Sequence, residues 1–268
     1  MAVFLYLNMS NSIGVFDSGI GGTSIWKEIH KLLPNEDTIY LADSKNAPYG
    51  EKRKDEILRL SIKNTEFLLN QNCKLIVVAC NTSTTNTIDY LRKTYSVPFI
   101  GIEPAIKPAA LQTKTKRVGI LATKGTLSSA LFYNTSNLHA AGIEIIEKEG
   151  KGLVKLIEEG EVDSSKMRDL LQSYLKPMVD SNIDCLVLGC THYPYLVPLL
   201  RELLPKHIKI IDSGEAVARQ TKKILEKNNL LNKKSSSAMR NNIFSNSDIS
   251  ILEELLKNER CKVSYLDF

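Results

Sequence analysis

The chain has 268 residues, of which 43% are hydrophobic and 24% are charged, a composition typical of a soluble enzyme with one large or two modest domains. Its formal net charge of +5 comes from Lys and Arg residues that are scattered rather than grouped in runs, so we expect no nucleic-acid partner. A mildly basic protein of this kind is better suited to an anionic small molecule.

The cysteines exclude two further classes of protein. Their number, five, is odd and no CxxC pair occurs, which argues against a disulfide framework and against a zinc ribbon. Free thiols indicate a reducing compartment, so we expect a cytoplasmic protein. The apolar patch 2–7 has no basic segment before it and no small-residue cleavage site after it. Residues 1–12 are therefore predicted to be an extension or an added strand, rather than a signal peptide or a membrane span.

The first half of the chain opens with a strand at 13–16, a glycine-rich turn and a helix that continues to Leu33. This order suits anion binding, because the first N–H groups of a helix have no partner within it. It is not a dinucleotide fingerprint, because Ser24 stands where the third glycine would be, and no P-loop occurs in the chain. On the alternative interpretation the glycines only permit a tight turn. Asp17 ends the strand and is expected to face a site.

A second turn follows the predicted strand at 38–42 and Asp43. Pro and Gly flank Tyr49 in the segment 46–50, which predicts a loop bordering a site, the alternative being an ordinary surface turn. The break at Glu103-Pro104-Ala105 marks a domain boundary. The other elements predicted for this half are helices at 54–72 and 84–94 and strands at 74–79 and 97–102.

The second half repeats the element order of the first. A strand at 117–122 leads through a polar turn into a helix, and it follows the strand at 13–16 at nearly the same distance along the chain that separates Cys80 from Cys190. This predicts a duplicated α/β fold, with two similar open, mostly parallel sheets related by a pseudo-twofold axis and a cleft between them. The other elements predicted here are strands at 143–149, 184–189 and 208–211 and helices at 153–160, 165–179 and 214–227.

The C-terminal tail is predicted to return to the first domain. A polar, mobile linker is expected at 233–242, and two further segments, 243–248 and 262–268, flank a helix at 251–257. The predicted domains are therefore 1–104 together with 212–268, and 105–211.

Two stretches, 74–84 and 184–194, share the same sequence motif. Each is a run of Val, Ile and Leu that ends in a cysteine and polar residues, Cys80-Asn81-Thr82 in one and Cys190-Thr191-His192 in the other. Such apolar runs suit strands buried on both faces, and ligands bind beyond the carboxyl ends of strands in open α/β sheets. One cysteine alone is more often a small buried hydrophobe. Two in matching positions favour a catalytic site.

Two thiols on opposite walls of a cleft can act on the two faces of one carbon. A thiolate removes a proton from one face and a thiol returns a proton to the other. Because an unperturbed Cys has a pKa of about 8.5, the thiols need acid–base partners, and Asp17 and His192 are the candidates. The alternative is a zinc site made from Cys80, Cys190 and His192, although their spacing matches no zinc signature.

Five segments together resemble the motif set of bacterial glutamate racemases, in the same order from Ile13 to the C-terminus. They are 16–22, 46–50, 79–82, 101–104 and 189–194. The resemblance implies interconversion of L- and D-glutamate by a two-thiol mechanism with Cys80 and Cys190, supplying D-glutamate for peptidoglycan. It implies no pyridoxal phosphate or other cofactor and no metal. We also expect a homodimer with no membrane partner.

The resemblance also assigns the supporting residues. Its accessory acid–base positions fall on Asp17, Glu158 and His192, and Asp43 matches a further acidic position. The substrate-binding positions match Asp17, Ser18, Tyr49, Gly50, Asn81, Thr82, Thr191 and His192.

The chain departs from the family pattern in three places. Lys151-Gly152 stand before Glu158 where a Cys-Pro pair is usual, residues 1–12 extend beyond the usual start, and 245–248 match the pattern only loosely.

Two rival functions have distinct signatures. Aspartate racemases share the two-cysteine architecture but typically have an acidic residue where this chain has His192. A two-domain binding protein for a small dicarboxylate would need Asn81, Thr82 and Thr191 but not two thiols.

Overall fold

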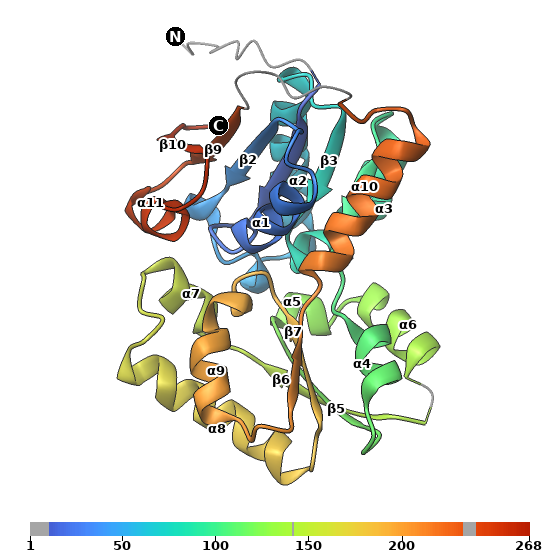
Figure 1. The fold of residues 1–268 in the computed structure, drawn as a ribbon, viewed down its shortest axis with the longest axis vertical. Helices are drawn as coiled ribbons and strands as arrows, with labels where there is room; N and C mark the ends of the chain where they lie inside the picture. The colour runs from blue at the N-terminus through green and yellow to red at the C-terminus, as the bar shows by residue number, and fades with distance from the viewer. Residues whose placement is uncertain (1–10, 141, 233–239) are drawn as a thin grey trace.

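A computed structural model describes residues 11–140, 142–232 and 240–268. The chain forms two parallel sheets, one above the other in Figure 1, with helices between the strands. The six-stranded sheet has the order β10-β9-β2-β1-β3-β4, and the four-stranded sheet has the order β6-β5-β7-β8. The predicted α/β class with two parallel sheets is confirmed.

The strands of the first sheet are β1 (Ile13–Asp17), β2 (Thr38–Ala42), β3 (Leu75–Val78), β4 (Phe99–Gly101), β9 (Asn241–Ser245) and β10 (Lys262–Tyr265). Those of the second are β5 (Arg117–Ala122), β6 (Glu144–Glu149), β7 (Cys185–Gly189) and β8 (Lys209–Ile211). The α-helices are α1 (Thr23–Leu32), α2 (Lys54–Asn70), α3 (Asn81–Thr94), α4 (Ile106–Gln112), α5 (Lys124–Leu127), α6 (Ala130–His139), α7 (Leu153–Glu158), α8 (Ser165–Asp180), α9 (Val197–Leu203), α10 (Gly214–Lys227) and α11 (Ser250–Leu256). Short 3₁₀ helices are η1 (Ser44–Asn46), η2 (Tyr49–Glu51) and η3 (Tyr193–Leu196).

The two sheets share a strand order. The set β2-β1-β3-β4 corresponds to β6-β5-β7-β8. In chain order, the first strand of each set lies between the second and the third, so β1 is beside β3 and β5 is beside β7. Gly14 pairs with Ile76 in the first sheet, and Gly119 pairs with Leu186 in the second. Cys80 lies four residues beyond Ile76, and Cys190 lies four residues beyond Leu186. The register therefore places the two cysteines at equivalent strand ends.

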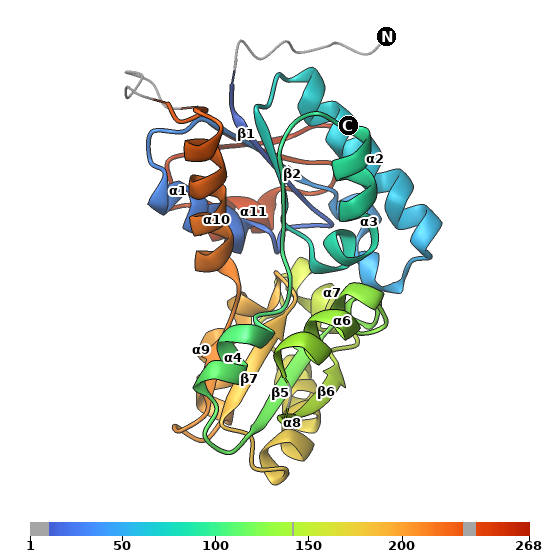
Figure 2. The ribbon, with the colours of Figure 1, turned by 90° about the vertical axis from the view of Figure 1, so that its right-hand side faces the viewer.

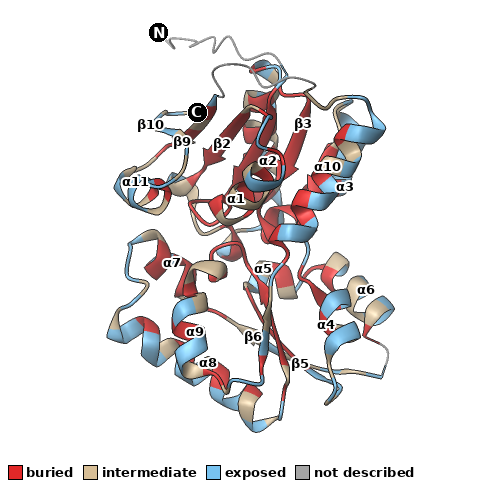
Figure 3. Cartoon of the chain, in the orientation of Figure 1, coloured by how far each residue is buried: buried red, intermediate tan, exposed pale blue. Residues whose placement is uncertain are grey.

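Helices cover both faces of each sheet, as the turned view shows (Figure 2). In the first sheet α1 and α10 pack together on one face and α2 and α3 on the other. In the second sheet α8 and α9 bury Leu186 and Leu188, while α4 and α6 bury Val118 and Val187. The strands β1, β2, β3, β5 and β7 are accordingly buried almost throughout, the edge strands β6, β8 and β10 are partly exposed, and the outward faces of the helices are exposed (Figure 3). Because helices cover both faces of a central strand, its residues are apolar throughout instead of alternating between apolar and polar.

Some predicted elements require correction. Helix α3 begins at Asn81 rather than at residue 84, because Cys80 caps it by accepting a hydrogen bond from the Ser83 N–H. Helices α4 and α9 were not predicted; each has only 7 residues and carries a proline, Pro108 in α4 and Pro198 in α9. Residues 241 and 242 belong to β9 rather than to a linker.

Other predictions stay open. Those for residues 1–10 and 233–239 lie outside the described residues, and the domain boundaries near 104 and 211 stay a prediction. Within the described part of the chain, no helix is both long and apolar enough to cross a membrane.

Candidate active site

The first thiol, Cys80, lies between β3 and α3 and is 5% exposed. Its sulfur accepts a hydrogen bond from the Ser83 N–H at 3.4 Å and lies 3.7 Å from the Ser18 hydroxyl oxygen. Burial and the negative charge of Asp17 raise the pKa of Cys80 well above its ordinary value, although the contacts with Ser83 and Ser18 oppose this. The charge of Cys190 also raises this pKa. The raised pKa favours the thiol form of Cys80.

The second thiol, Cys190, has a basic partner. Its sulfur lies 3.7 Å from His192 Nδ1, and His192 Nε2 lies 2.5 Å from Glu158 Oε1. Burial disfavours the charged imidazolium, but the bonds to Cys190 and Glu158 outweigh burial and raise the pKa of His192 well above its ordinary value. A protonated His192 donates to the carboxylate and to the sulfur together. His192 thus connects the sulfur of Cys190 to the carboxylate of Glu158.

The carboxylate of Glu158, at the end of α7, contacts residues of the other half of the molecule. Its Oε1 accepts from the Ile20 N–H at 2.7 Å, and its Oε2 accepts from the Ser44 hydroxyl at 2.9 Å. The Gly21 nitrogen lies 3.3 Å from His192 Nε2, but a protonated Nε2 cannot accept, and the much shorter contact with Glu158 is the effective bond. The structure therefore brings the predicted acid–base residue Glu158 to His192.

Asp17 ends β1 and is fully buried. It accepts from the Gly22 N–H at 2.8 Å and from the Thr191 hydroxyl at 3.4 Å. Burial raises its pKa, and the positive charge of His192 and the backbone N–H groups of Gly22 and Ser18 only partly offset this. Asp17 therefore interacts electrostatically with the surroundings of both thiols. Its charge raises the pKa of Cys80, and the charge of His192, which contacts Cys190, lowers the pKa of Asp17.

In the glycine-rich turn, two of the N–H groups that the sequence offered to an anion are used by carboxyl groups of the protein itself. The N–H groups of Ile20 and Gly22 donate to Glu158 and Asp17, the protein's own carboxyl groups. The glycines instead leave space for the side chains of Glu158 and His192. A Cβ at Gly19 would lie 2.0 Å from Glu158 Oε1, and a Cβ at Gly21 would lie 2.2 Å from His192 Nδ1.

Three of the predicted substrate-binding side chains, Asn81, Thr82 and Thr191, are each 3% exposed. Both side-chain polar atoms of Asn81 are buried with no hydrogen-bond partner among the described residues, which is costly unless a ligand supplies one. Thr82 shares a 2.8 Å hydrogen bond with Thr123, which follows β5 of the other sheet. Asn81 thus offers two unused hydrogen-bonding groups beside Cys80.

The loop with Tyr49 and Gly50 borders this site, and its interior is organised by Asp43. The Tyr49 hydroxyl donates to Asp43 at 2.5 Å and accepts from Asn64 at 3.2 Å, so it is not free for a ligand. A Cβ at Gly50 would lie 2.8 Å from the Thr123 Cβ. Substrate contacts at Tyr49 and Gly50 would have to come from the backbone. Asp43, fully buried, also accepts from Asn246 on the tail.

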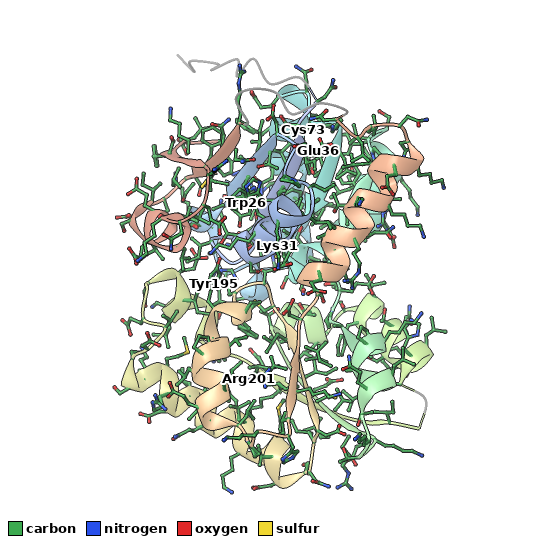
Figure 4. All side chains as sticks on the ribbon, in the orientation of Figure 1. Trp26, Lys31, Glu36, Cys73, Tyr195 and Arg201 are labelled. Carbon is green, nitrogen blue, oxygen red and sulfur yellow. The ribbon has the colours of Figure 1, made fainter. Side chains whose placement is uncertain are left out.

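Sequence reasoning missed three residues of this region. Ser44 contacts Glu158, Thr123 contacts Thr82, and the Tyr195 hydroxyl lies 2.5 Å from the Thr23 hydroxyl. Figure 4 labels Tyr195 where the two halves of the chain meet. Each contact joins residues far apart in the sequence, so no local pattern points to it.

The residues of the alternative zinc site do not converge on a metal position. Among residues 11–140, 142–232 and 240–268, no group of three or more His, Cys, Asp and Glu side chains is arranged to hold a metal ion. Cys80 instead faces Ser18 and Ser83, while Cys190 faces His192.

Two buried thiols at equivalent strand ends, each with its own acid–base surroundings, define a racemase-type site on a two-sheet α/β fold. The Asp/Glu/Hydantoin racemase family model matches residues 13–221. The chain belongs to this family.

Within the family, the similar proteins carry one name. Glutamate racemase from Herpetosiphon aurantiacus is 45% identical over 224 residues, covering 84% of this chain and 88% of that protein. Glutamate racemase from Ectopseudomonas mendocina is 44% identical over 252 residues, covering 93% and 95%. The crystal structure of Escherichia coli glutamate racemase in complex with L-glutamate and the activator UDP-MurNAc-ala is similar with a TM-score of 0.84 and 32% identity, covering 96% of this chain and 98% of that one.

Proposed function

We infer that this protein is an isomerase that interconverts L- and D-glutamate. The observation that carries this inference is the pair of buried thiols, Cys80 and Cys190, at equivalent strand ends. A binding protein has no need of two such thiols. Glutamate is preferred over aspartate because His192 occupies the position that is typically acidic in aspartate racemases, and because the relatives described above are glutamate racemases.

We propose a mechanism in which the thiols act on opposite faces of Cα. In one direction the Cys190 thiolate, hydrogen-bonded to protonated His192, removes the α-proton, and the Cys80 thiol donates a proton to the other face. The starting state is restored when the two sulfurs exchange protons with solvent. In the reverse direction Cys80 must act as the base, and Cys190 as the acid. No cofactor or metal takes part in this scheme.

The remaining predicted residues hold the substrate in our proposal. Asn81 offers an amide that has no hydrogen-bond partner within the described part of the chain, and Thr191, Ser18 and the Tyr49-Gly50 backbone border the same buried region. Thr82 and His192 lie two residues beyond the two thiols. Hydrogen bonds to both carboxylates and to the ammonium group of glutamate would fix Cα between the sulfurs.

We also propose that the protein works in the cytoplasm as a homodimer and supplies D-glutamate for peptidoglycan. The five free thiols support the cytoplasm, and the peptidoglycan role follows from the reaction. The domain division proposed is 1–104 with 212–268, and 105–211. In its support, β9 pairs with β2 and β10 pairs with β9, so both strands of the tail belong to the first sheet.

A single assay tests the function. Purified protein without added cofactor is incubated with L-glutamate in D₂O, while optical rotation and α-deuteration are followed. We expect loss of rotation and deuterium in both enantiomers, and much slower change with L-aspartate. Binding of glutamate without rotation change would instead support the binding-protein alternative, and faster turnover of aspartate would reverse the substrate assignment.

A further inference from the structure

Ser44 lies at the start of η1, in the half of the molecule opposite to Glu158, and its hydroxyl donates to Glu158 Oε2 at 2.9 Å. The other oxygen, Oε1, is the one that contacts His192. A carboxylate held at both oxygens cannot rotate about its terminal bond without losing one of these partners. The bond from Ser44 therefore fixes the plane of the carboxylate that His192 meets.

The loop that carries Ser44 is itself firmly held. Asp43, the residue before it, accepts from Tyr49, Asn46 and Asn246 and is fully buried. The Asn46 N–H also donates to the Asp43 carbonyl at 2.9 Å. A hydroxyl on a rigid loop is preorganised, which is what accurate positioning of a charged group requires.

We propose that Ser44 is a positioning residue of the racemase: its hydroxyl orients Glu158, so that Glu158 holds His192 with Nδ1 aimed at the sulfur of Cys190. This role rests on the proposed function, because it acts on the acid–base chain of the second thiol. The hydroxyl itself touches neither thiol in the structure, so its effect must pass through Glu158 and His192.

Three ionisable side chains act on His192, namely Glu158, Cys190 and Asp17. The contacts with Glu158 and Cys190 keep the pKa of His192 high against the opposing effect of burial. If the carboxylate loses its second anchor, the short contact to Nε2 lengthens and the pKa of His192 falls toward its ordinary value. This change is specific to the proposed role, because a general loss of stability would not select His192.

The test compares Ser44→Ala with Ser44→Thr, which keeps the hydroxyl. We expect Ser44→Ala to lower kcat/KM for both enantiomers by about tenfold, as for a lost hydrogen bond to a charged group. By NMR, the titration midpoint of the His192 ring should fall in Ser44→Ala and stay near the wild-type value in Ser44→Thr. The chain has only 4 histidines, and His192→Asn assigns the signal by its disappearance.

A matched control removes another serine bond across the molecule. Ser213 donates its hydroxyl to the Glu103 carbonyl at 2.5 Å, away from both thiols. Ser213→Ala should leave the His192 midpoint unchanged, and thermal unfolding of all variants reports whether each one folds.

The outcomes separate this proposal from the proposed function. A wild-type midpoint in Ser44→Ala, with or without lost activity, would overturn the positioning role while leaving the racemase assignment intact. An equal defect in Ser44→Thr would overturn the role of the hydroxyl. If the wild-type protein does not racemise glutamate, the function fails, yet the NMR comparison still decides whether Ser44 governs His192.

Discussion

The surroundings of the two thiols differ although their backbones correspond. Cys80 lies beside the Ser18 hydroxyl, and burial and the charge of Asp17 raise its pKa against the opposing effect of that hydroxyl. Cys190 instead faces His192, which is backed by Glu158. The duplicated strands fix where the sulfurs lie, while the side chains around them give each sulfur different hydrogen-bonding and ionisable neighbours.

The correspondence extends to the residue two positions beyond each thiol, Thr82 in one half and His192 in the other. Thr82 bonds to Thr123 in the turn after β5, and His192 packs against Gly21 in the turn after β1. Each half thus reaches into the first turn of the other. The same position holds a neutral hydroxyl on one side and an ionisable ring on the other, so the acid–base asymmetry comes from side chains rather than from the fold.

Removing either thiol should have the largest effect. Inversion needs proton loss on one face and proton gain on the other, so Cys80→Ala and Cys190→Ala should each lower racemisation by about a thousandfold or more. Polarimetry of L- and D-glutamate measures this. In D₂O, any remaining α-deuteration should be confined to one enantiomer, and to opposite enantiomers in the two variants.

The buried Cys73 provides the control, because it packs beneath Gly14 away from the thiol pair. Cys73→Ala should leave turnover largely intact. The two-thiol mechanism would be wrong if a single thiol variant racemised glutamate near the wild-type rate or exchanged both enantiomers. Undetectable exchange decides nothing, since the α-proton is a very weak acid.

Removing the basic partner of Cys190 should sharpen the comparison with a smaller effect. His192→Asn eliminates the group that can donate to the sulfur, and we expect kcat to fall by about a hundredfold in one direction and less in the other. Initial rates with each enantiomer at saturation measure the two values. Because the equilibrium constant is one, KM must shift so that kcat/KM stays equal in both directions.

Exposed His207 is the control, and His207→Asn should behave as wild type. Equal losses of kcat in both directions for His192→Asn would contradict the asymmetry and indicate a shared positioning role.

The positions of the thiols could be predicted from the sequence, because buried parallel strands leave a clear apolar run and the site follows at their carboxyl ends. Ser44 and Tyr195 could not, because their partners Glu158 and Thr23 lie in the other half of the chain. Glu158 itself was assigned only through a family resemblance.

The missed helices have a local cause. Helix α9 is 7 residues long and carries Pro198 in its first turn, where a missing N–H costs nothing. Helix α4 is equally short and carries Pro108 near its start. A proline in so short a segment looks like a break when only the sequence is considered.

Adding a side chain to the glycine-rich turn tests the contribution of Glu158, the residue that supports His192 beside Cys190. A methyl group at Gly19 would collide with Glu158 Oε1, so Gly19→Ala must displace the carboxylate that supports His192. We expect kcat/KM to fall by about tenfold, the effect of one lost charge-assisted hydrogen bond. Gly214→Ala is the control, since its new methyl would meet only flexible side-chain atoms at 3.1 Å. Wild-type activity in Gly19→Ala would show that the position of Glu158 matters little.

The residues before the two strands that lead to Cys80 and Cys190 also correspond, Lys74 before β3 and Asp184 before β7. Lys74 forms a buried ion pair with Glu36, 2.6 Å between Nζ and Oε2. Figure 4 labels Glu36 at the end of the first sheet that lies far from the second. Asp184 instead accepts from Thr113, Lys114 and Thr115 near the protein surface. Both residues anchor a strand start, and neither reaches the site.

Replacing Asp184 should therefore have the smallest effect, on stability alone. Partial burial raises the pKa of its carboxyl, but the hydrogen bonds from Thr113, Lys114 and Thr115 outweigh burial and lower the pKa to about 2. Since this pKa is lower in the folded than in the unfolded chain, the stabilisation is present above the ordinary Asp value near 3.9 and is lost as the pH falls toward 2. After allowance for solvent screening, we expect Asp184→Asn to lower the free energy of unfolding by about 1 kcal/mol at pH 7, with unchanged turnover. Urea unfolding of both proteins between pH 7 and the acid limit of folding measures the difference, which should shrink as the pH falls below about 4. A difference that stays constant with pH would show that the lost bonds, and not the carboxylate charge, stabilise the start of β7.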